Sequence, residues 1–317
     1  MRVRHVLITT VLVAMGVVAA AVPSQAQLTT FCNGSASNVT VPGDLVVRAG
    51  QSCDLTNVTI QGNATVRADA NLLLEDVTIE GNLVVQANGF ANVITSSVAG
   101  NTRLNNALGL YSEDSEHSGN VNAQGPEFVY TFGAIHGGNV ISTDGETFIE
   151  SGRLARNLTT SGDVLTDVYD SVINGRLSVT GATFGSVLCA SEIDGAIELT
   201  NNSDLVQLGP GQIAGCDYIV AGSNVTLTGN TATVTVTDSV VRGNLVCADN
   251  TPAAVVTNTR IRGTDQCDTA SAAVSAMKSR AATADVDDRK ADVLDKIDER
   301  TGVAEEAADE AGVAFGG

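Results

Sequence analysis

The sequence predicts an all-β protein: a right-handed, three-sided parallel β-helix of about 11 coils of about 19 residues each. The first observation behind this prediction is a Gly, usually followed by Asn, that returns every 19 residues. The evenly spaced glycines are Gly43, Gly62, Gly81, Gly100, Gly119 and Gly138. The second observation is an alternation of apolar and polar residues inside each repeat, which is typical of strands with one buried face. A short period sustained over most of a chain indicates a solenoid, and parallel crossovers favour the right-handed form.

Three short strands are expected in each repeat. Counted from the corner Gly, apolar residues fall at offsets 2 and 4, as Leu45 and Val47 do, and more loosely at offsets 10 and 12, as Cys53 and Leu55 do. A third apolar site lies two residues before the next Gly, as at Ile60. Equivalent strands of successive coils would stack in parallel, about 4.8 Å apart. The Asn residues that follow the glycines are expected to bond to each other along the stack as a structural ladder. They are Asn63, Asn82, Asn101, Asn120, Asn139, Asn157 and Asn244.

The N-terminal part of the chain divides into three segments. Residues 1–26 are predicted to be a secretory signal peptide, since Arg2 and Arg4 precede an apolar stretch that ends in small residues. Residues 27–42 are expected to cap the N-terminal end of the solenoid, because open strand edges must be covered. Residues 43–268 form the predicted β-helix itself.

Residues 269–317 are predicted to form an Ala-rich, acidic helical tail. A capping helix is expected over 272–282, and a second helix is indicated by apolar positions at helical spacing. That second stripe consists of Val286, Lys290, Val293 and Ile297. Beyond Gly302 the acidic, Ala-rich composition favours disorder.

The last repeats carry a resemblance to known proteins. They read Gly243-Asn244-Leu245-Val246-Cys247-Ala248-Asp249-Asn250-Thr251-Pro252, followed by a closing Gln266-Cys267. This stretch resembles uncharacterised secreted actinobacterial β-helix proteins. The repeated Gly-Asn turns without long loops are also similar, more distantly, to bactofilins. The resemblance covers about Val39 to Cys267 and implies a fold and a location, but no established activity.

The six cysteines are expected to form disulfides, because an exported chain folds in an oxidising compartment. The predicted pairs are Cys32–Cys53, Cys189–Cys216 and Cys247–Cys267. Both members of the last pair fall at offset 4 of successive coils, so their Cα atoms should lie one strand spacing apart. The first pair is similarly close to one coil apart. The Cys189–Cys216 pair follows by elimination, and its two cysteines lie at different offsets from the corner Gly.

One stretch departs from the regular repeat. Aromatic residues gather between Tyr111 and Tyr169, and several occupy offsets that should face outward. The candidates for a contact surface are Tyr111, Tyr130, Phe132, Phe148 and Ile149. A patch of exposed apolar groups on a rod favours contact with a partner. The alternative interpretation is that the C-terminal helices cover these aromatics.

His117 and His136 lie 19 residues apart at the position that elsewhere holds Ile, Val or Leu, so they should stack in adjacent coils. With help from Glu116, such a pair could bind a divalent metal. The alternative is a local slip of the coil, with the imidazoles hydrogen-bonded or turned outward. No cofactor is expected.

The net charge of the chain limits which partners it can bind. The net charge is −19, and removal of Arg2 and Arg4 with the signal peptide takes it to −21. A surface this acidic disfavours nucleic acid and anionic membranes as partners. Nothing in the mature sequence is expected to hold the protein in a membrane once the signal peptide is removed.

The uniform coils offer no wall for a substrate pocket, and no catalytic motif is present, so an enzyme is not expected. We expect a secreted, non-enzymatic structural or adhesive solenoid that presents a contact surface in the cell envelope or extracellular matrix. Its partner would be a cell-wall polysaccharide or another envelope protein, and self-association stays open. The alternative is a carbohydrate-active enzyme, a polysaccharide lyase or hydrolase of the β-helix type.

Overall fold

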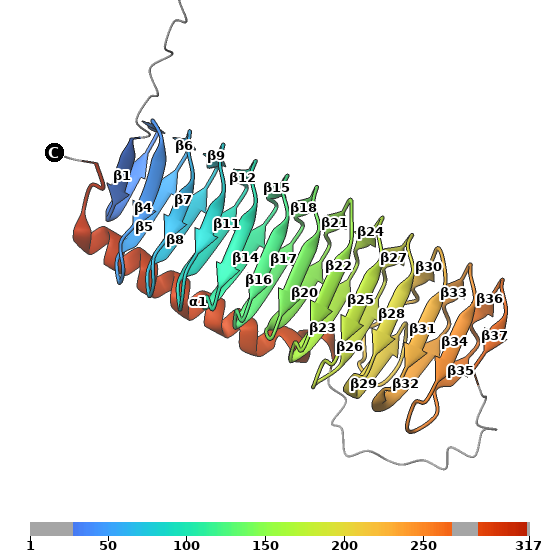
Figure 1. The fold of residues 1–317 in the computed structure, drawn as a ribbon. Coiled ribbons are helices and arrows are strands. Elements are labelled where there is room, and N and C mark those ends of the chain that lie inside the picture. Colours follow the sequence, from blue (N-terminus) through green and yellow to red (C-terminus); the bar gives the residue numbers. More distant parts are fainter. Residues whose placement is uncertain (1–27, 268–284, 316–317) are drawn as a thin grey trace, which may run out of the picture.

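The chain is a parallel β-solenoid in a computed structural model that describes residues 28–267 and 285–315 (Figure 1). The expected signal peptide and the helix expected over 272–282 lie outside the described residues. Successive strands pass through three parallel sheets in turn, which confirms the three-sided coil. The rod has about 13 turns instead of about 11, because residues before Gly43 add a first coil and β37 begins a last one.

The 13-stranded sheet, called sheet A, holds the strands that follow the corner glycines. Its strands are β1 (Thr29–Cys32), β4 (Asp44–Val47), β7 (Ala64–Val66), β10 (Leu83–Val85), β13 (Thr102–Asn105), β16 (Val121–Gln124), β19 (Val140–Thr143), β22 (Leu158–Ser161), β25 (Leu177–Thr180), β28 (Ile197–Thr200), β31 (Val225–Thr228), β34 (Leu245–Ala248) and β37 (Asp265–Gln266). Leu83 pairs with Thr102 and Thr102 with Val121, so equivalent offsets stack in register.

The first 12-stranded sheet, sheet B, carries the most apolar outer face. Its strands are β2 (Gly34–Ser37), β5 (Ser52–Thr56), β8 (Asn71–Glu75), β11 (Phe90–Ile94), β14 (Gly109–Glu113), β17 (Phe128–Phe132), β20 (Glu146–Glu150), β23 (Leu165–Tyr169), β26 (Ser186–Cys189), β29 (Ser203–Leu208), β32 (Thr231–Thr237) and β35 (Val255–Thr257). Most of its strands from β8 to β29 are buried along nearly their whole length, which in a solenoid requires a cover on the outer face.

The second 12-stranded sheet, sheet C, consists of two-residue strands that complete each coil. They are β3 (Thr40–Val41), β6 (Thr59–Ile60), β9 (Thr78–Ile79), β12 (Ser97–Val98), β15 (Glu116–His117), β18 (Ile135–His136), β21 (Arg153–Leu154), β24 (Val172–Ile173), β27 (Glu192–Ile193), β30 (Val220–Ala221), β33 (Val240–Val241) and β36 (Arg260–Ile261). In each strand the second residue points into the rod and the first points to solvent.

Residues 28–42 correct the expected N-terminal cap. They form β1, β2 and β3, which pair in parallel with β4, β5 and β6 and are therefore the first coil. The offset pattern was not visible there because this coil lacks a corner Gly-Asn. Capping of this end is done by the other end of the chain, as described below.

The Asn ladder is confirmed at the corner between sheets C and A. The side-chain Oδ1 of Asn63 accepts a hydrogen bond from the backbone N–H of Asn82, 2.9 Å away, and the same bond recurs from coil to coil. The run begins at Asp44 and ends where the backbone N–H of Arg176 donates to Asn157. Gly precedes the Asn residues from Asn63 to Asn139, where a Cβ would meet the backbone of the coil before, whereas Arg156 precedes Asn157.

The interior of the rod is apolar at both ends and partly polar in the middle. Leu, Val, Ile, Ala and Cys fill the inward positions of the first four coils. In the middle coils the corresponding positions include buried polar side chains, namely Thr102, Ser112, His117, Thr131, His136, Ser142, Thr147, Thr160, Thr166 and Ser186. Thr166, for example, stacks on Ser186 in register. A buried hydroxyl is tolerated where it finds a hydrogen-bond partner, which the Thr131 hydroxyl lacks among the described residues.

All three predicted disulfides are confirmed. Their Cα–Cα distances are 5.6 Å for Cys32–Cys53, 5.0 Å for Cys189–Cys216 and 4.5 Å for Cys247–Cys267. The first and last join neighbouring coils at the two ends of the rod, where a solenoid lacks a neighbour on one side. The middle one attaches a loop to the rod, which explains why the two offsets differ.

Candidate functional site

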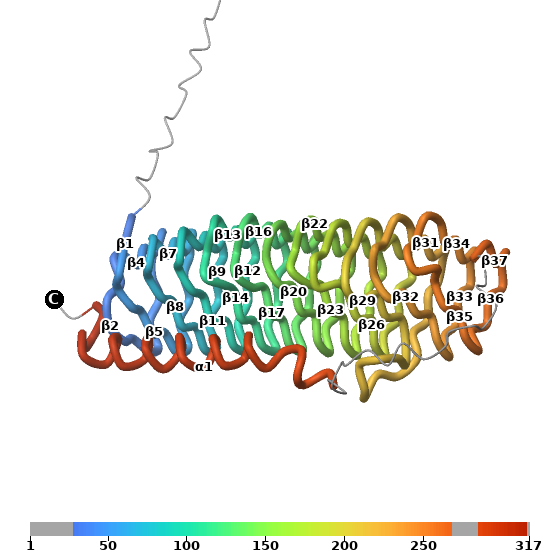
Figure 2. Tube along the Cα trace, turned by 90° about the horizontal axis from the view of Figure 1, so that it is seen from below, coloured from blue at the N-terminus to red at the C-terminus, as the bar shows by residue number. Residues whose placement is uncertain are grey.

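A single long helix covers the outer face of sheet B. Helix α1 (Val286–Ala311) runs back along the rod from the region of β23 to β2, antiparallel to the direction in which the coils progress (Figures 1 and 2). Asp285 is its N-cap and forms a capping box with Asp288. The sequence predicted a helix from Val286 and disorder beyond Gly302. The second part was wrong, because the helix continues to Ala311 on the surface of the rod.

The length of α1 matches the spacing of the coils. Its 26 residues span about 39 Å at about 1.5 Å per residue. Eight parallel strands at about 4.8 Å spacing, from β2 to β23, cover about 34 Å between the first and the last. The contacts between the helix and the sheet show the same match between helical rise and coil spacing. Arg289 bonds to Asp167 in β23, and Thr301 bonds to Asn92 in β11. Those 12 helical residues rise about 18 Å, against about 19 Å for the four intervening coil steps.

The helix packs on a stripe of outward side chains along sheet B. Leu73, Asn92, Tyr111, Tyr130, Phe148 and Asp167 follow each other in register at the centre of this stripe. Val293 and Ile297 are buried in the same cluster as Tyr130 and Phe148. The ring centroids of Tyr130 and Phe148 are 5.5 Å apart. Toward the C-terminus of α1 the buried residues are alanines, so the helix can approach the sheet closely.

This arrangement corrects the predicted contact surface. Tyr130 is 3% exposed and Phe148 is 1% exposed, so neither is available to a partner while α1 is in place. Tyr111 and Phe132 are half-buried and pack against the same cluster. The alternative interpretation, in which a C-terminal helix covers the aromatics, describes the structure.

Ile149 was expected to face outward, and it faces the interior with no exposed surface. The cause is the length of one coil. Phe128 pairs with Glu146, 18 residues later, whereas Gln124 still pairs with Thr143, 19 residues later. The residue missing from this coil is therefore in the turn before β20. Each residue of β20 then lies one position away from where its offset from the corner Gly predicts, so side chains expected to face outward face inward.

The start of α1 is held by a buried ion pair. Arg289 Nε lies 2.6 Å from Asp167 Oδ2, and Arg289 Nη2 donates to Asp167 Oδ1 at 3.0 Å. Both side chains are nearly inaccessible to solvent. The Tyr169 hydroxyl donates to Asp167 Oδ2 at 2.5 Å, and the backbone N–H of Val187 donates to Oδ1 at 2.9 Å. Burial alone would lower the pKa of Arg289, but the Asp167 carboxylate outweighs it and raises that pKa above its usual value.

A second charged contact lies one coil away. Lys290 Nζ is 2.7 Å from Glu150 Oε1, and the Tyr130 hydroxyl donates to the other oxygen of Glu150. Burial raises the pKa of Tyr130, and the hydrogen bond to Glu150 raises it further. Charge pairs that are withdrawn from water are costly to break, so these contacts fix the register of α1 on sheet B.

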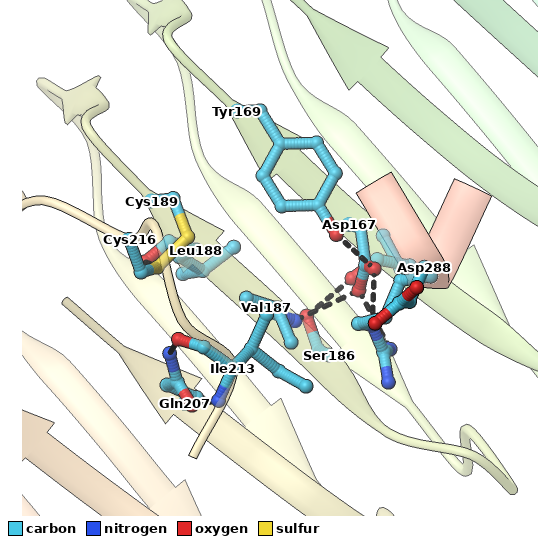
Figure 3. Close-up of polar contacts among 12 residues, drawn as sticks. Asp167, Tyr169, Ser186, Val187, Leu188, Cys189, Gln207, Ile213, Cys216 and Asp288 are labelled. Atoms are coloured by element: carbon cyan, nitrogen blue, oxygen red, sulfur yellow. Dashed lines mark hydrogen bonds and ion pairs between the residues drawn. A yellow bond between two sulfur atoms is a disulfide. The ribbon is translucent and has the colours of Figure 1, made fainter. Parts of the chain in front are cut away.

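The loop 209–219, which belongs to the one extended coil among the described residues, lies beside the start of α1. Equivalent positions Asn202 and Asn230 are 28 residues apart instead of 19. Gln207 organises the loop by accepting from the backbone N–H of Ile213 at 2.9 Å and donating to its carbonyl (Figure 3). The Cys189–Cys216 disulfide ties the loop to β26, and Ala214 forms a β-bridge with Asp285, the N-cap of the helix.

The other end of α1 caps the N-terminal edge of sheet B. The backbone N–H of Ser35 in β2 donates to the Gly312 carbonyl at 2.8 Å, and the Ala314 N–H donates to the Ser35 carbonyl at 2.9 Å. Arg300 also fastens this half, since its Nε donates to Asn71 Oδ1 at 2.7 Å. Paired backbone groups no longer offer a template for another strand, so the C-terminal segment has the capping role that was expected of residues 27–42.

The two histidines stack in adjacent coils as predicted, with ring centroids 5.2 Å apart and planes inclined by 8°. They point into the rod and are essentially inaccessible. His117 is satisfied by Thr102 and Ser112, each 3.0 Å from one ring nitrogen. Both ring nitrogens of His136 are buried without a partner. In register, Val121 replaces Thr102 beside His136, which removes the equivalent contact.

The arrangement does not favour the predicted metal site. Glu116 precedes His117 in a strand, so it points to solvent while the imidazole points inward. No group of three or more potential ligands that could hold a metal occurs among the described residues. Burial lowers the pKa of His117 to about 4, and burial followed by the neighbouring His117 lowers that of His136 well below 6.5. The pair is therefore neutral and belongs to the core.

Sequence reasoning missed the polar residues that hold α1. Asp167 occupies a position that is aromatic in the three preceding coils, and its partner lies 122 residues away. A signal was available: Arg289 and Lys290 are adjacent cations at the start of an otherwise acidic segment. Their target could not be chosen, because acidic residues are scattered over the whole rod.

Comparison of the chain with protein-family models, with curated proteins and with solved structures gave no match. The resemblance to secreted actinobacterial β-helix proteins and to bactofilins therefore stays a prediction. Within residues 28–267 and 285–315, no helix combines the length and the apolar character needed to cross a membrane. The fold defines the chain as a disulfide-linked parallel β-solenoid with a helical strap along one face.

Proposed function

We propose that this protein is an exported, non-enzymatic structural rod of the cell envelope that binds cell-wall polysaccharide along one corner. The observation that carries the proposal is the reinforcement of the rod at its weak points. Solenoids fray at terminal coils, which have a neighbour on one side only. Here Cys32–Cys53 and Cys247–Cys267 join the terminal coils, and each closes a loop of about 20 residues, worth about 3 kcal/mol by loop entropy.

Helix α1 adds a second reinforcement, since it connects β23 with β2 across eight strands of sheet B. A partner cannot reach the aromatic stripe without displacing the helix. We therefore propose that the contact surface lies on the remaining outer faces. Sheet C and its corner with sheet B have no covering element among the described residues.

An open groove of about 380 Å³ follows that corner. Its turn positions form a ladder in which the Thr95 hydroxyl donates to Asp76 Oδ1 at 2.8 Å, and Asp114 takes the next place. Thr78, Ser97 and Glu116 border the groove, and Ile135, which is 50% exposed, closes one end. Hydroxyls and carboxylates repeated at about 4.8 Å suit the hydroxyls of a repeating sugar chain. The carboxylates favour neutral or amino sugars over acidic polymers.

The test is retention of the mature protein on purified bacterial cell wall and on a panel of neutral, amino-sugar and acidic polysaccharides. Ile135→Ser combined with Asp114→Asn should weaken retention at least about fivefold, the effect of about 1 kcal/mol at a contact position. Val303→Ser is the matched control, because Val303 is 52% exposed on the outside of α1. It should leave retention unchanged.

The same incubations are assayed for new reducing ends and unsaturated ends. Retention without new ends supports a structural role, whereas release of new ends would support the alternative of a polysaccharide lyase or hydrolase. Equal retention of the groove variant and the control would contradict the groove as the contact surface. Absence of retention on every wall fraction would contradict the proposed function itself.

A further inference from the structure

The described residues contain a second, larger groove, where the loop 209–219 meets the first turn of α1. Its volume is about 650 Å³. The floor is apolar and is formed by Leu165, Leu205 and Ile213, all nearly buried, together with Val164 and Phe184. Figure 3 shows Ile213 of the loop and Asp288 of α1 near β26, on the two sides from which the groove is built.

Phe184 is the feature that points to a ligand. The residue is 49% exposed, whereas Tyr169 and Phe148 on the outer face of sheet B are covered; Tyr218 in the loop 209–219 is also exposed, at 52%. The ring is nevertheless held in place: the Phe184 N–H donates to the Val164 carbonyl at 2.6 Å, and the Arg289 guanidinium lies 5.2 Å from the ring centroid. Gly185 follows in a left-handed conformation with φ 84°, and a Cβ there would collide with the Leu205 carbonyl. The turn therefore presents a fixed aromatic face toward the groove.

The rim of the groove is acidic. Glu146, Asp204 and Asp292 line it, and among the described residues their carboxylates take part in no hydrogen bond or ion pair. Arg289 is the one cation in the lining, and its charge is already opposed by the bidentate contact with Asp167 beneath. Burial raises the pKa of Glu146, Lys296 opposes this rise, and the Asp292 carboxylate adds to it. Lys296 acts on Glu146 from outside the lining, and no cation other than Arg289 lines the groove itself.

We propose that this groove binds a basic segment of a partner polypeptide, with a Lys or Arg side chain laid across Phe184 and its charged end at the free carboxylates. The chemistry fits because these side chains have an apolar stem and a charged head. The stem matches the apolar floor, the aromatic ring attracts a cation, and Glu146 with Asp292 supplies charge-assisted hydrogen bonds. Acidic ligands are repelled, and a wholly apolar ligand leaves the carboxylates without partners. The inference names a protein partner for the proposed rod, and its site is separate from the polysaccharide groove.

The experiment uses the full mature chain and a fluorescein-labelled peptide with the sequence Gly-Leu-Lys-Leu-Lys-Leu-Gly, followed by fluorescence anisotropy. A second peptide carries Glu in place of Lys. The Lys peptide should bind, its Kd should increase with salt because the contact is ionic, and the Glu peptide should not bind. Phe184→Ala, and separately the double change Glu146→Gln/Asp292→Asn, should each increase the Kd about tenfold.

Two matched controls come from the same chain. Phe31 is 48% exposed and also stacks on an arginine, Arg48, but lies at the other end of the rod, so Phe31→Ala should leave the Kd unchanged. Asp298 is an exposed carboxylate further along α1, so Asp298→Asn should also have no effect on the Kd. Thermal unfolding of every variant checks that the fold is kept.

Several results would overturn the inference. If the two peptides bind equally, or if the groove variants behave like the controls, the groove is not a site for basic segments. If spermidine competes as strongly as the Lys peptide and with the same sensitivity to the variants, the site takes small amines instead of a polypeptide. If binding appears only after Lys278 and Arg280 are replaced by Ala, the occupant is the chain's own segment. If the protein is retained on polysaccharide but binds neither peptide, this inference is wrong and the proposed function still stands.

Discussion

Asp163 offers a direct test of how the middle of the rod tolerates polar groups. It lies in the turn between β22 and β23 with no exposed surface. Its Oδ1 accepts from the Gly145 N–H at 3.2 Å and its Oδ2 from the Thr147 hydroxyl at 2.8 Å. Burial raises the pKa of Asp163 from 3.8 to about 6, and these hydrogen bonds only partly offset the cost of burying the charge.

The same corner position is Asn in later coils. Asn202 accepts from the Ala182 N–H at 2.8 Å, and Asn230 accepts from the Asn202 N–H at 2.9 Å, as Asp163 does from Gly145. Asp163→Asn should therefore keep the backbone contact and remove the buried charge. A difference of about two pKa units corresponds to about 3 kcal/mol. That amount is the upper bound of the expected gain in unfolding free energy at neutral pH.

The direction in which stability changes with pH follows from proton linkage. The folded state binds the Asp163 proton more tightly than the unfolded chain does, so this group makes the wild-type protein less stable as pH increases from about 4 to about 6. Asp163→Asn should be nearly as stable as wild type at about pH 4 and more stable above about pH 6. Urea unfolding followed by circular dichroism at several pH values measures the difference. Asp194→Asn, at an exposed carboxylate, is the control. A gain that is independent of pH, or a loss at neutral pH, would refute the reasoning.

Three further predictions concern the core and the strap. Val121→Thr should add about 1 kcal/mol to the unfolding free energy in a urea titration, because the new hydroxyl can bond to the unpartnered His136. The control is Val140→Thr, one coil further, which has no histidine beside it and should be destabilising. Ile149→Ser should cost about 2–5 kcal/mol, since this side chain is interior, and a change within experimental error would show that β20 has the other register. Arg289→Met should lower the unfolding free energy by about 3–5 kcal/mol, because it leaves the buried Asp167 carboxylate unpaired. On heating, the helical circular dichroism signal should be lost before the β signal. Loss of both signals together at the wild-type temperature would contradict this.

The regular part of the fold was predictable because its contacts are local in the repeat. Each strand pairs with the strand one coil away, so a 19-residue period is also the register of the sheets. The same arithmetic placed Cys247 beside Cys267 and stacked His117 on His136. It failed at Ile149, where one missing residue before β20 exchanges the two faces, and periodicity does not say which turn lost the residue.

The cover of the rod was decided only by the tertiary structure. Burial of the aromatic stripe depends on α1, whose contacts join Arg289 to Asp167 and Gly312 to Ser35 across long stretches of chain. The helix was recognisable from its apolar spacing, but its direction along the rod and the face it covers were not. Stacking of repeats is set by neighbours at a fixed separation in the sequence, and the repeat itself records that separation. Docking of a helix that occurs once depends on complementary shape and charge between distant segments, and no period in the sequence records them.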